Sequence, residues 1–427
     1  MTEPAASRRP LSSLSPRVRW AVPAVVAVAV VGAFAAPPLF ASAEGANLPA
    51  VTPQQLVATV ADAKPVPLSG TVVYTARLGL PEIPLTQLTG ADPVALLGGS
   101  STLRVWTDGV QRSRVSLLGD TSEYSSVQDG AQAWTYSSAK DQVVHYSLSA
   151  SDQARYDKAA GDVRAGTVPD VAGTVPELAG GLPTPAAAAA AALAQVQTVS
   201  SVTLAAPTTV AGRSAYQLVV TPKSGATLVA KIVVAIDAKT STPLRVQAWS
   251  VKDAKSPALE IGFTDVAFGA PDNASLAFSP PAGAKVRDVV VPLPTPTEVA
   301  GAKPADKALP AGVSISGTGW ETVTQLSGVD VAGLVSGNPA ALPTLPGAKP
   351  IIGSQSGQDL LGEFLPADGS GGPAAPGLDA GALYNQLTTV VPEGRILTST
   401  LLSVLVTNDG RVLAGAVPAD TLRALAR

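Results

Sequence analysis

The sequence contains no cysteine, one histidine (His145) and one methionine at position 1. Without cysteine there are no disulfides, no thiolate nucleophiles, no cysteine-ligated metals and no lipid attachment through a cysteine after an export signal. A single histidine leaves little for metal binding or acid–base catalysis. A serine hydrolase would need His145 as its base, yet the chain has no Gly-x-Ser-x-Gly motif. We therefore expect no catalytic residues, no metal and no cofactor.

Aromatic and charged residues are also scarce, at 4% and 14%, whereas Gly and Pro number 39 and 38. This balance suits many turns around aliphatic strands and argues against a mainly helical protein. The net charge is -3, although the first 43 residues carry four arginines against one glutamate. The remainder is thus more acidic than the whole. It forms no basic stripe for phosphates, so we expect no nucleic-acid binding.

The N-terminal segment has the parts of an export signal. After Arg17 and Arg19, an uncharged apolar run extends from Trp20 to Phe40 and is followed by Ala41-Ser42-Ala43. Basic residues, an apolar run and a small-x-small site are typical of a secretory signal. The portion before Pro37 is also long enough for a membrane anchor. Residues 1–43 are therefore predicted to be a signal peptide or an N-terminal membrane anchor. Both outcomes place the rest of the chain outside the cytoplasm.

Two helices and two groups of strands are predicted in the next part of the chain. Thr52-Pro53-Gln54-Gln55 predicts a helix over 53–63, and Thr184-Pro185 followed by seven alanines predicts one over 185–197. Period-two patterns separated by turns such as Asp108-Gly109 and Asp129-Gly130 predict a meander. The expected strands are 70–78, 102–107, 110–118, 123–128, 131–136, 142–148, 201–205, 214–221, 228–237, 244–250 and 259–268.

The strand over 228–237 is apolar on both faces from Leu228 to Ile236 and is interrupted there only by Lys231. Such a strand must be covered on both faces or must line an apolar cavity. Two helices cannot cover both faces of about eleven strands, so we expect the sheet to curl around them and to leave a cavity or groove. Its continuous core is predicted to contain Leu218, Ile232, Val234, Val246, Ile261 and Phe263.

The C-terminal third begins with a proline-rich linker over 288–312 and continues as an extension over 313–427 that is predicted to be partly disordered. Within the extension we expect a strand in 317–326, loop over 328–376, a helix over 380–390, a hairpin of 396–406 with 411–417, and a short helix over 419–427. An isolated hairpin this apolar is marginal in water. It is therefore expected to dock on the main domain or on a membrane.

The order of features between Thr52 and Val286 resembles the LolA/LolB and RseB (MucB) superfamily of extracytoplasmic lipoprotein-binding domains, especially its actinobacterial LolA-like proteins. The segments that carry the resemblance are LSGTVVYTARLGLP, LRVWTDG, DGAQAWTYSS, VAGRSAYQLVVTP, VVAIDAKTSTPLRVQAW, IGFTDVAFG and FSPPAGAKV. They span a little over half of the chain. The resemblance implies an α+β fold over 50–287 in which a curved antiparallel sheet forms an unclosed β-barrel, with helices plugging its concave face.

The resemblance also implies that this domain holds acyl chains or another hydrophobic ligand and has no catalytic residues to transfer. Candidate cavity-lining residues are Trp106, Trp134, Tyr136, Tyr216, Val233, Ala235 and Trp249, although aromatic strand residues are also common in cores. A basic residue near the cavity handles ligand in some members, and Arg77, Arg104 or Arg112 is a candidate counterpart.

Three function classes stay open at this point. A carrier or chaperone for a lipid or for the acyl chains of a lipoprotein predicts an apolar binding face. An envelope-stress sensor or regulator resembling RseB, acting on a membrane anti-sigma factor, predicts a partner surface and an ordered C-terminal segment. A hydrolase predicts clustered polar groups in a cleft. The expected partners are lipid or lipoprotein, a membrane protein, and the membrane through the N-terminal segment.

Overall fold

The structure is a computed structural model that describes residues 48–61, 63–80, 91–164, 182–194, 199–291, 312–331 and 380–427. Ala46–Arg427 form one compact unit. The predicted signal or anchor over 1–43 lies outside the described residues, as do most of the linker over 288–312 and residues 332–376 of the predicted loop over 328–376. No helix within the described ranges is long and apolar enough to cross a membrane.

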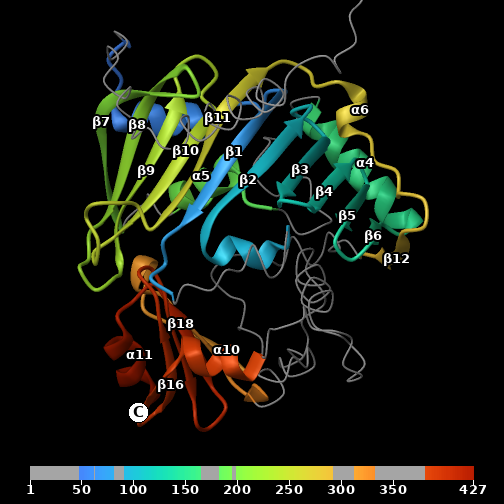
Figure 1. Ribbon diagram of the computed structural model, residues 1–427. Coiled ribbons are helices and arrows are strands. Elements are labelled where there is room, and N and C mark those ends of the chain that lie inside the picture. Colours follow the sequence, from blue (N-terminus) through green and yellow to red (C-terminus); the bar gives the residue numbers. More distant parts are fainter. Residues whose placement is uncertain are drawn as a thin grey trace, which may run out of the picture. The chain divides into compact units, whose positions relative to one another are not determined.

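The described strands belong to two sheets, and the helices lie between or beside them (Figure 1). The first sheet contains β1 (Leu68–Ala76), β2 (Gly99–Thr107), β3 (Arg112–Leu118), β4 (Glu123–Asp129), β5 (Gln132–Ser137), β6 (Gln142–Ser147), β7 (Ser200–Val210), β8 (Arg213–Pro222), β9 (Val229–Asp237), β10 (Pro243–Ser250), β11 (Leu259–Phe268) and β12 (Lys285–Val290). Its helices are α2 (Pro53–Ala61), η2 (Pro93–Leu97), α4 (Ala150–Arg164), α5 (Pro185–Ala194) and α6 (Asn273–Leu276).

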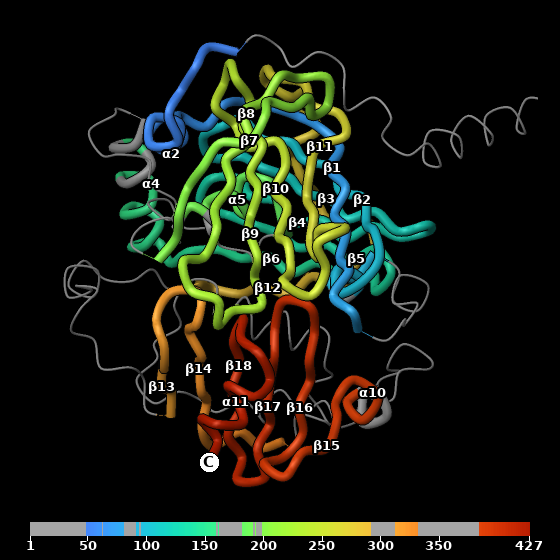
Figure 2. The backbone as a smooth tube through the Cα atoms, turned by 90° about the vertical axis from the view of Figure 1, so that its left-hand side faces the viewer, coloured from blue at the N-terminus to red at the C-terminus, as the bar shows by residue number. Residues whose placement is uncertain are grey.

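The first sheet has the strand order β12-β6-β5-β4-β3-β2-β1-β11-β10-β9-β8-β7. Two antiparallel meanders, β2 to β6 and β7 to β11, meet on either side of β1, and β12 adds to β6 in parallel. The two edge strands β7 and β12 do not pair, so the curved sheet stays unclosed (Figures 1 and 2). The predicted fold class, a curved and mainly antiparallel sheet with helices, is confirmed.

One face of the sheet, here called the inner face, carries the main hydrophobic core. It is the face on which Val72, Leu103, Val234 and Val246 lie, and α5 contacts it at β10 and β11. In Figure 2 the strands β9 and β10 lie in front of α5, which is therefore on their far side. Five of the six predicted core residues are buried in this cluster, and Ile232 packs against it half-buried. The predicted core is thus confirmed.

The two predicted helices begin at their predicted residues because their caps form. In α2, the Gln55 amide donates to Thr52 Oγ1 at 3.2 Å and the Thr52 amide donates to Gln55 Oε1 at 2.8 Å. In α5, the Ala187 amide donates to Thr184 Oγ1 at 3.2 Å. These reciprocal bonds satisfy amides that have no partner inside the helix.

A glycine sets the geometry where the two meanders meet. A Cβ at Gly70 in β1 would lie 2.4 Å from the carbonyl oxygen of Asp265 and 2.9 Å from the Phe263 ring. The register of β1 with β11 shifts immediately afterwards, between Thr71 and Val72. Any side chain at residue 70 would push β11 away from β1, so the strand that joins both halves of the sheet requires glycine here.

Several elements were not expected from the sequence. The helix α4 follows β6, the short helix η2 precedes β2, and β7 is longer than the predicted strand, extending to Val210. Residues 288–290 were assigned to the linker but are the last residues of β12. The parallel pairing of β12 has no local sequence signal, because its partner β6 lies about 140 residues earlier in the chain.

The second sheet is formed by the C-terminal extension. Its strands are β13 (Val313–Ser316), β14 (Val323–Leu326), β15 (Thr389–Val391), β16 (Gly394–Thr398), β17 (Ser403–Thr407) and β18 (Val412–Gly415), in the order β13-β14-β18-β17-β16-β15. The helices η3 (Gly319–Glu321), α10 (Ala380–Leu387) and α11 (Ala419–Ala426) accompany it. Leu405, Leu413 and Leu422 form its own core.

Two strands of this extension were predicted too long. The predicted strand 396–406 is a hairpin of β16 and β17, because Ser399 makes a tight turn in which its hydroxyl accepts the amide of Leu402 at 2.9 Å. The predicted strand in 317–326 is only β14, since β13 and η3 precede it. Hydroxyl-to-amide bonds of this kind offer the backbone an alternative to the sheet ladder.

The second sheet is hydrogen-bonded to the first. The Leu228 amide donates to the Ala416 carbonyl at 2.8 Å, and the Thr400 amide donates to the Leu78 carbonyl at 2.8 Å. The Trp320 indole donates to Ser200 Oγ at 2.8 Å. The predicted docking of the C-terminal hairpin on the main domain is therefore observed.

Candidate functional site

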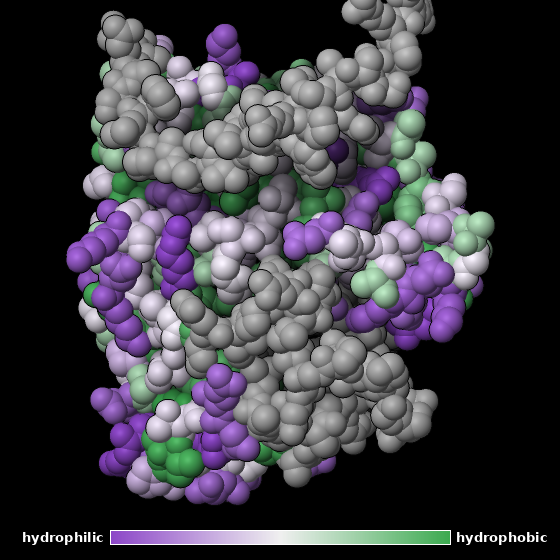
Figure 3. All heavy atoms as spheres, viewed as in Figure 1, coloured by the Kyte–Doolittle hydropathy of each residue, from purple (hydrophilic) through white to green (hydrophobic). Residues whose placement is uncertain are grey.

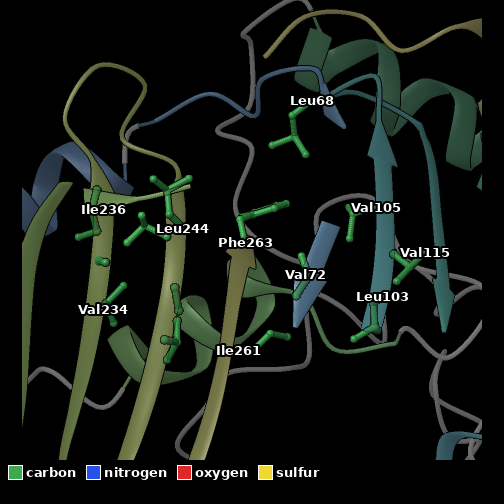
Figure 4. Packing of buried hydrophobic residues seen from close by; sticks show 14 of the residues in the cluster. Leu68, Val72, Leu103, Val105, Val115, Val234, Ile236, Leu244, Ile261 and Phe263 are labelled. Carbon is green, nitrogen blue, oxygen red and sulfur yellow. The ribbon is translucent and has the colours of Figure 1, made fainter. Parts of the chain in front are cut away.

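The inner face of the first sheet is a continuous apolar surface. Cross-strand register aligns Leu218, Val234 and Val246 in one row, which continues through Ile261 and Tyr74. The same face extends over β2 and β3, and Figure 4 shows side chains from β1, β2, β3, β9, β10 and β11 gathered toward one interior. Such a face can hold a ligand through apolar contact alone.

Alanine side chains from α5 cover part of this face. The helix has the sequence PAAAAAAALA, and against the core it places the buried Ala189 and the partly buried Ala188 and Leu193. Burial of one methyl group contributes only about 0.8 kcal/mol. The described side chains of α5 therefore offer little apolar contact for each turn of helix compared with a helix rich in leucine. The cover of the inner face can be displaced by a ligand that supplies more apolar contact than α5 does.

Inward-facing residues are incompletely buried toward one end of the sheet. Ala248 in β10 pairs with Ile232 in β9 and with Leu259 in β11, and all three are half-buried. Tyr74, one row further in, is also half-buried. Apolar side chains that face inward and still retain accessible surface offer contact area to a ligand. This end of the inner face is the candidate binding region.

The candidate region also contains polar groups. Ser101 in β2 is paired with Tyr74 in β1, and its hydroxyl is buried with no hydrogen-bond partner. Burial raises the pKa of Tyr74, so its phenol is neutral and can donate. Buried polar groups without partners are uncommon. A bound ester, amide or carboxyl group would satisfy the Ser101 hydroxyl.

The structure distributes the seven predicted cavity-lining residues over both faces. Tyr216 lies on the inner face beside Ile236, and its hydroxyl donates to the Pro49 carbonyl at 2.9 Å. The other six lie on the opposite, outer face: Trp106, Trp134, Tyr136, Val233, Ala235 and Trp249. The seven residues therefore do not share one face. The inner residues Tyr74 and Ser101 were not predicted.

The outer aromatic residues form their own contacts. Trp134 stacks on His145 at 5.2 Å with an interplanar angle of 12°, and Phe278 lies 5.9 Å from Trp134. Trp106 has the guanidinium groups of Arg104 and Arg114 within 6 Å of its ring centroid. These ring and cation–π contacts stabilise the outer surface of the sheet, and the tilted contact with Trp134 holds the chain segment that carries Phe278.

The three candidate basic residues have different surroundings. Arg104 lies on the outer face over Trp106. Arg112 forms an ion pair with Asp108 at 3.3 Å and donates to Asn273 Oδ1 at 3.0 Å, so it fastens α6 to the β2–β3 turn. Arg77 follows the last residue of β1 and donates from its side chain to the Pro257 carbonyl at 3.3 Å. Of the three, Arg77 lies nearest to the half-buried end of the inner face, because β1 ends beside Leu259.

The surroundings of His145 bear on hydrolase chemistry. Its Nδ1 lies 2.8 Å from Asp288 Oδ1 and its Nε2 lies 3.3 Å from Gln132 Oε1. Neither partner is a hydroxyl nucleophile, and a hydrolytic base needs such a nucleophile within hydrogen-bond reach. In the described part of the chain, no group of three or more His, Asp or Glu side chains is placed to hold a metal ion.

A hydroxyl-rich network also lies on the outer face. Ser116 Oγ and Ser125 Oγ are 2.8 Å apart, Ser125 bonds to Glu123, and Arg114 donates to Glu123 at 3.0 Å. Burial raises the pKa of Glu123, but the hydrogen bonds from Ser125, Ser116 and Arg114 outweigh it and lower the pKa overall. An ionised carboxylate held by an arginine is a weak base. The network is therefore suited to a structural role.

Hydrophilic residues gather where α4 and the neighbouring strands β6 and β12 lie, while hydrophobic residues are visible in the middle of the same view (Figure 3). The cluster under α4 is small and contains Tyr156, Tyr146 and Val144. The main apolar surface thus belongs to the inner face between β1 and β10.

No family model and no curated protein matches the chain. Among solved structures, the MucA/MucB complex from Pseudomonas aeruginosa matches at 16% identity with a TM-score of 0.38, covering 88% of this chain and 95% of that one. A LolA-superfamily protein from Nitrosomonas europaea matches at 12% identity and a TM-score of 0.21, covering 54% and 99%. A putative outer-membrane lipoprotein-sorting domain from Vibrio parahaemolyticus matches at 10% identity and a TM-score of 0.19, covering 52% and 93%. These proteins are of the group that the sequence segments resemble.

Proposed function

We propose that this protein binds a hydrophobic ligand outside the cytoplasm, a lipid or the acyl chains of a lipoprotein, on the inner face of its first sheet, and that it performs no chemistry. The N-terminal segment exports or anchors the chain. The observation that carries the proposal is the apolar inner face, which is covered by the alanine helix α5 and contains half-buried residues at one end.

The energetics support acyl chains as ligands. Each buried methylene contributes about 0.8 kcal/mol, so an acyl chain in contact with Ile232, Ala248 and Leu259 gains free energy with every methylene that it buries. The buried hydroxyl of Ser101 and the phenol of Tyr74 are placed to bond to the polar end of such a ligand. An apolar face of this kind distinguishes ligands by the length of their acyl chains. It binds them without a chemical reaction.

A fluorescent fatty acid tests the proposal by displacement with unlabelled acyl chains. Because of the methylene contribution, affinity should rise roughly fourfold for each added methylene until the face is filled. Ala248→Trp places bulk on the inner face and should weaken binding at least tenfold, whereas its neighbour Gln247→Trp places the same bulk on the outer face and should not. Equal effects of the two substitutions would contradict binding on the inner face.

A second candidate function is that of an envelope sensor or regulator acting on a membrane protein, such as an anti-sigma factor. The ordered C-terminal sheet favours it, since a simple carrier has no need of a second sheet hydrogen-bonded to the first. MucB, one of the proteins to which the chain is similar, has been solved in complex with the protein MucA. A pull-down with the purified protein distinguishes the two candidates. A regulator should still retain a membrane protein after lipid has been extracted, whereas a carrier should not.

A further inference from the structure

One end of the first sheet brings together chain segments that are far apart in sequence. The last residue of β1, Ala76, pairs with Gly99 at the start of β2 and with Leu259 at the start of β11. The Arg77 amide donates to the Ala258 carbonyl at 2.7 Å. The helix η2, the end of β1 and the β10–β11 hairpin therefore meet at the half-buried end of the inner face.

The turn between β16 and β17 is held at the same place. Ser250 Oγ donates to the Thr400 carbonyl at 2.6 Å, and Lys252 Nζ donates to the Ser399 carbonyl at 3.0 Å. Thr400 Oγ1 donates to the Arg77 carbonyl at 3.1 Å. Ser250 and Lys252 are the sequence neighbours of Val251, and their acceptors Thr400 and Ser399 lie in the turn that contains Leu402. The two apolar side chains are thus presented by loops that are fixed to each other.

Apolar side chains at this end are unusually exposed. The exposed fraction is 51% for Leu97, 57% for Val251 and 42% for Leu402. Three segments of different origin each place a large apolar residue in solvent at one end of the sheet. Apolar residues exposed together in this way commonly mark an interaction surface.

Basic side chains also lie in the segments that meet at this end. Arg77, Lys252 and Lys255 lie in the same segments and are exposed, in a chain whose net charge is -3. The one carboxylate of the β10–β11 hairpin tip, Asp253, accepts the Lys255 amide at 2.7 Å and the Ser256 hydroxyl at 2.8 Å. Asp253 is therefore occupied in shaping the turn. These bonds lower the pKa of Asp253, so it stays charged. Counted against Asp253 and Glu260, the three cations leave a small positive excess at this end of the sheet, although the whole protein is acidic.

We propose that this rim patch, formed by Leu97, Val251, Leu402, Arg77, Lys252 and Lys255, docks on the surface of an anionic lipid bilayer. Val251 and Leu402 enter the interface between headgroups and acyl chains, and the three cations contact headgroup phosphates. The long side chains of lysine and arginine can cover apolar surface while their charges stay in water, which suits this position. Docking would hold the half-buried end of the inner face at the membrane. The inference does not depend on ligand binding by that face.

The absence of cysteine allows a direct test with the full chain. Val251→Cys and, separately, Leu402→Cys are labelled with a polarity-sensitive fluorophore and mixed with vesicles of phosphatidylglycerol and phosphatidylcholine. A matched control is Val390→Cys in β15, which is 70% exposed and lies away from the patch. We expect blue-shifted emission from the first two labels and none from the third. The shift should be lost on pure phosphatidylcholine and at high salt, because the attraction is electrostatic.

A charge reversal adds a second readout. Lys255→Glu changes two units of charge at the patch and should lower the ratio of docked to undocked protein about thirtyfold. Lys239→Glu, an exposed lysine at the other end of the same strands, is its matched control and should leave the ratio unchanged. Equal shifts at Val251 and Val390, docking that ignores lipid charge, or equal effects of the two reversals would overturn the proposal. A shift at Val251 that needs an added envelope protein would also overturn it, because the patch would then be a protein interface.

Discussion

Truncation of Leu218 tests whether the inner face is the main core. Leu218 lies in the middle of β8, is fully buried and pairs with Leu204 in β7 and Val234 in β9. Leu218→Ala removes three heavy atoms from between these two side chains. A buried leucine truncated to alanine costs about 2 to 5 kcal/mol, and the value rises with the volume of the cavity that remains. Because β7 is an edge strand and can relax inward, we expect about 3 kcal/mol.

The assay is urea unfolding followed by tryptophan fluorescence, since Trp106, Trp134 and Trp249 belong to the first sheet. The urea concentration at the unfolding midpoint should fall, while the slope of the unfolding free energy against urea concentration stays constant. A loss of 3 kcal/mol corresponds to a decrease in Tm of about 6 to 12 °C for a domain of this size. Thr203→Ala, an exposed position on β7, is the control and should change stability by less than about 0.5 kcal/mol. A loss below about 1 kcal/mol for Leu218→Ala would refute the assignment of the inner face as the core.

Three further predictions concern charges and export. Arg213→Ala should destabilise the first sheet by about 1 to 3 kcal/mol in the same urea assay, because it leaves Asp237 buried without its ion pair; an unchanged midpoint would contradict this. Hydrogen bonding from Arg423 lowers the pKa of Glu393 from 4.5 to about 2, so its contribution to stability is complete above pH 4.5 and is lost as the pH falls toward 2. Glu393→Gln should therefore flatten the dependence of Tm on pH in that range. If the slope of Tm against pH equals that of the parent chain, the Glu393–Arg423 pair is not the cause of the pH dependence. A fusion of residues 1–50 to alkaline phosphatase should be active, because that enzyme matures only outside the cytoplasm; an inactive fusion made in good yield would contradict export.

The sequence predicted those parts of the fold that depend on local chemistry. The start of α2 followed from the reciprocal bonds of Thr52 and Gln55, and the turns at Gly109 and Gly130 followed from Asp-Gly pairs whose glycines adopt positive φ. The two-faced strand Val229–Asp237 led to the prediction of a curved sheet with a covered face. These signals lie within a few residues of the structure that they specify.

Features that depend on distant partners could not be read in the same way. The strand β12 pairs with β6 across about 140 residues, and nothing in its own sequence names that partner. The helix α4 has a polar sequence with weak periodicity, although the bond from the Asp152 amide to Ser149 Oγ is a capping signal that could have revealed its start.

The choice of face explains the outcome at the candidate site. Alternation along a strand separates two sets of side chains, but it does not say which set faces the helices when both are apolar or aromatic. Val233 and Ala235 therefore could not be distinguished from Ile232 and Val234 by their sequence pattern. The predicted site residues were mainly aromatic, and most of these aromatic residues lie on the outer face. Ser101 is a small residue, and only the structure shows that its buried hydroxyl has no hydrogen-bond partner.

The most direct test of the central claim is mass spectrometry of lipid extracted from the protein after it is purified from its native cells without detergent. We predict one lipid or acyl-bearing ligand bound in near-stoichiometric amount to the parent chain, and a decrease of at least tenfold for Ala248→Trp but not for Gln247→Trp. Folded protein that carries no lipid and takes up no fatty acid would contradict the account.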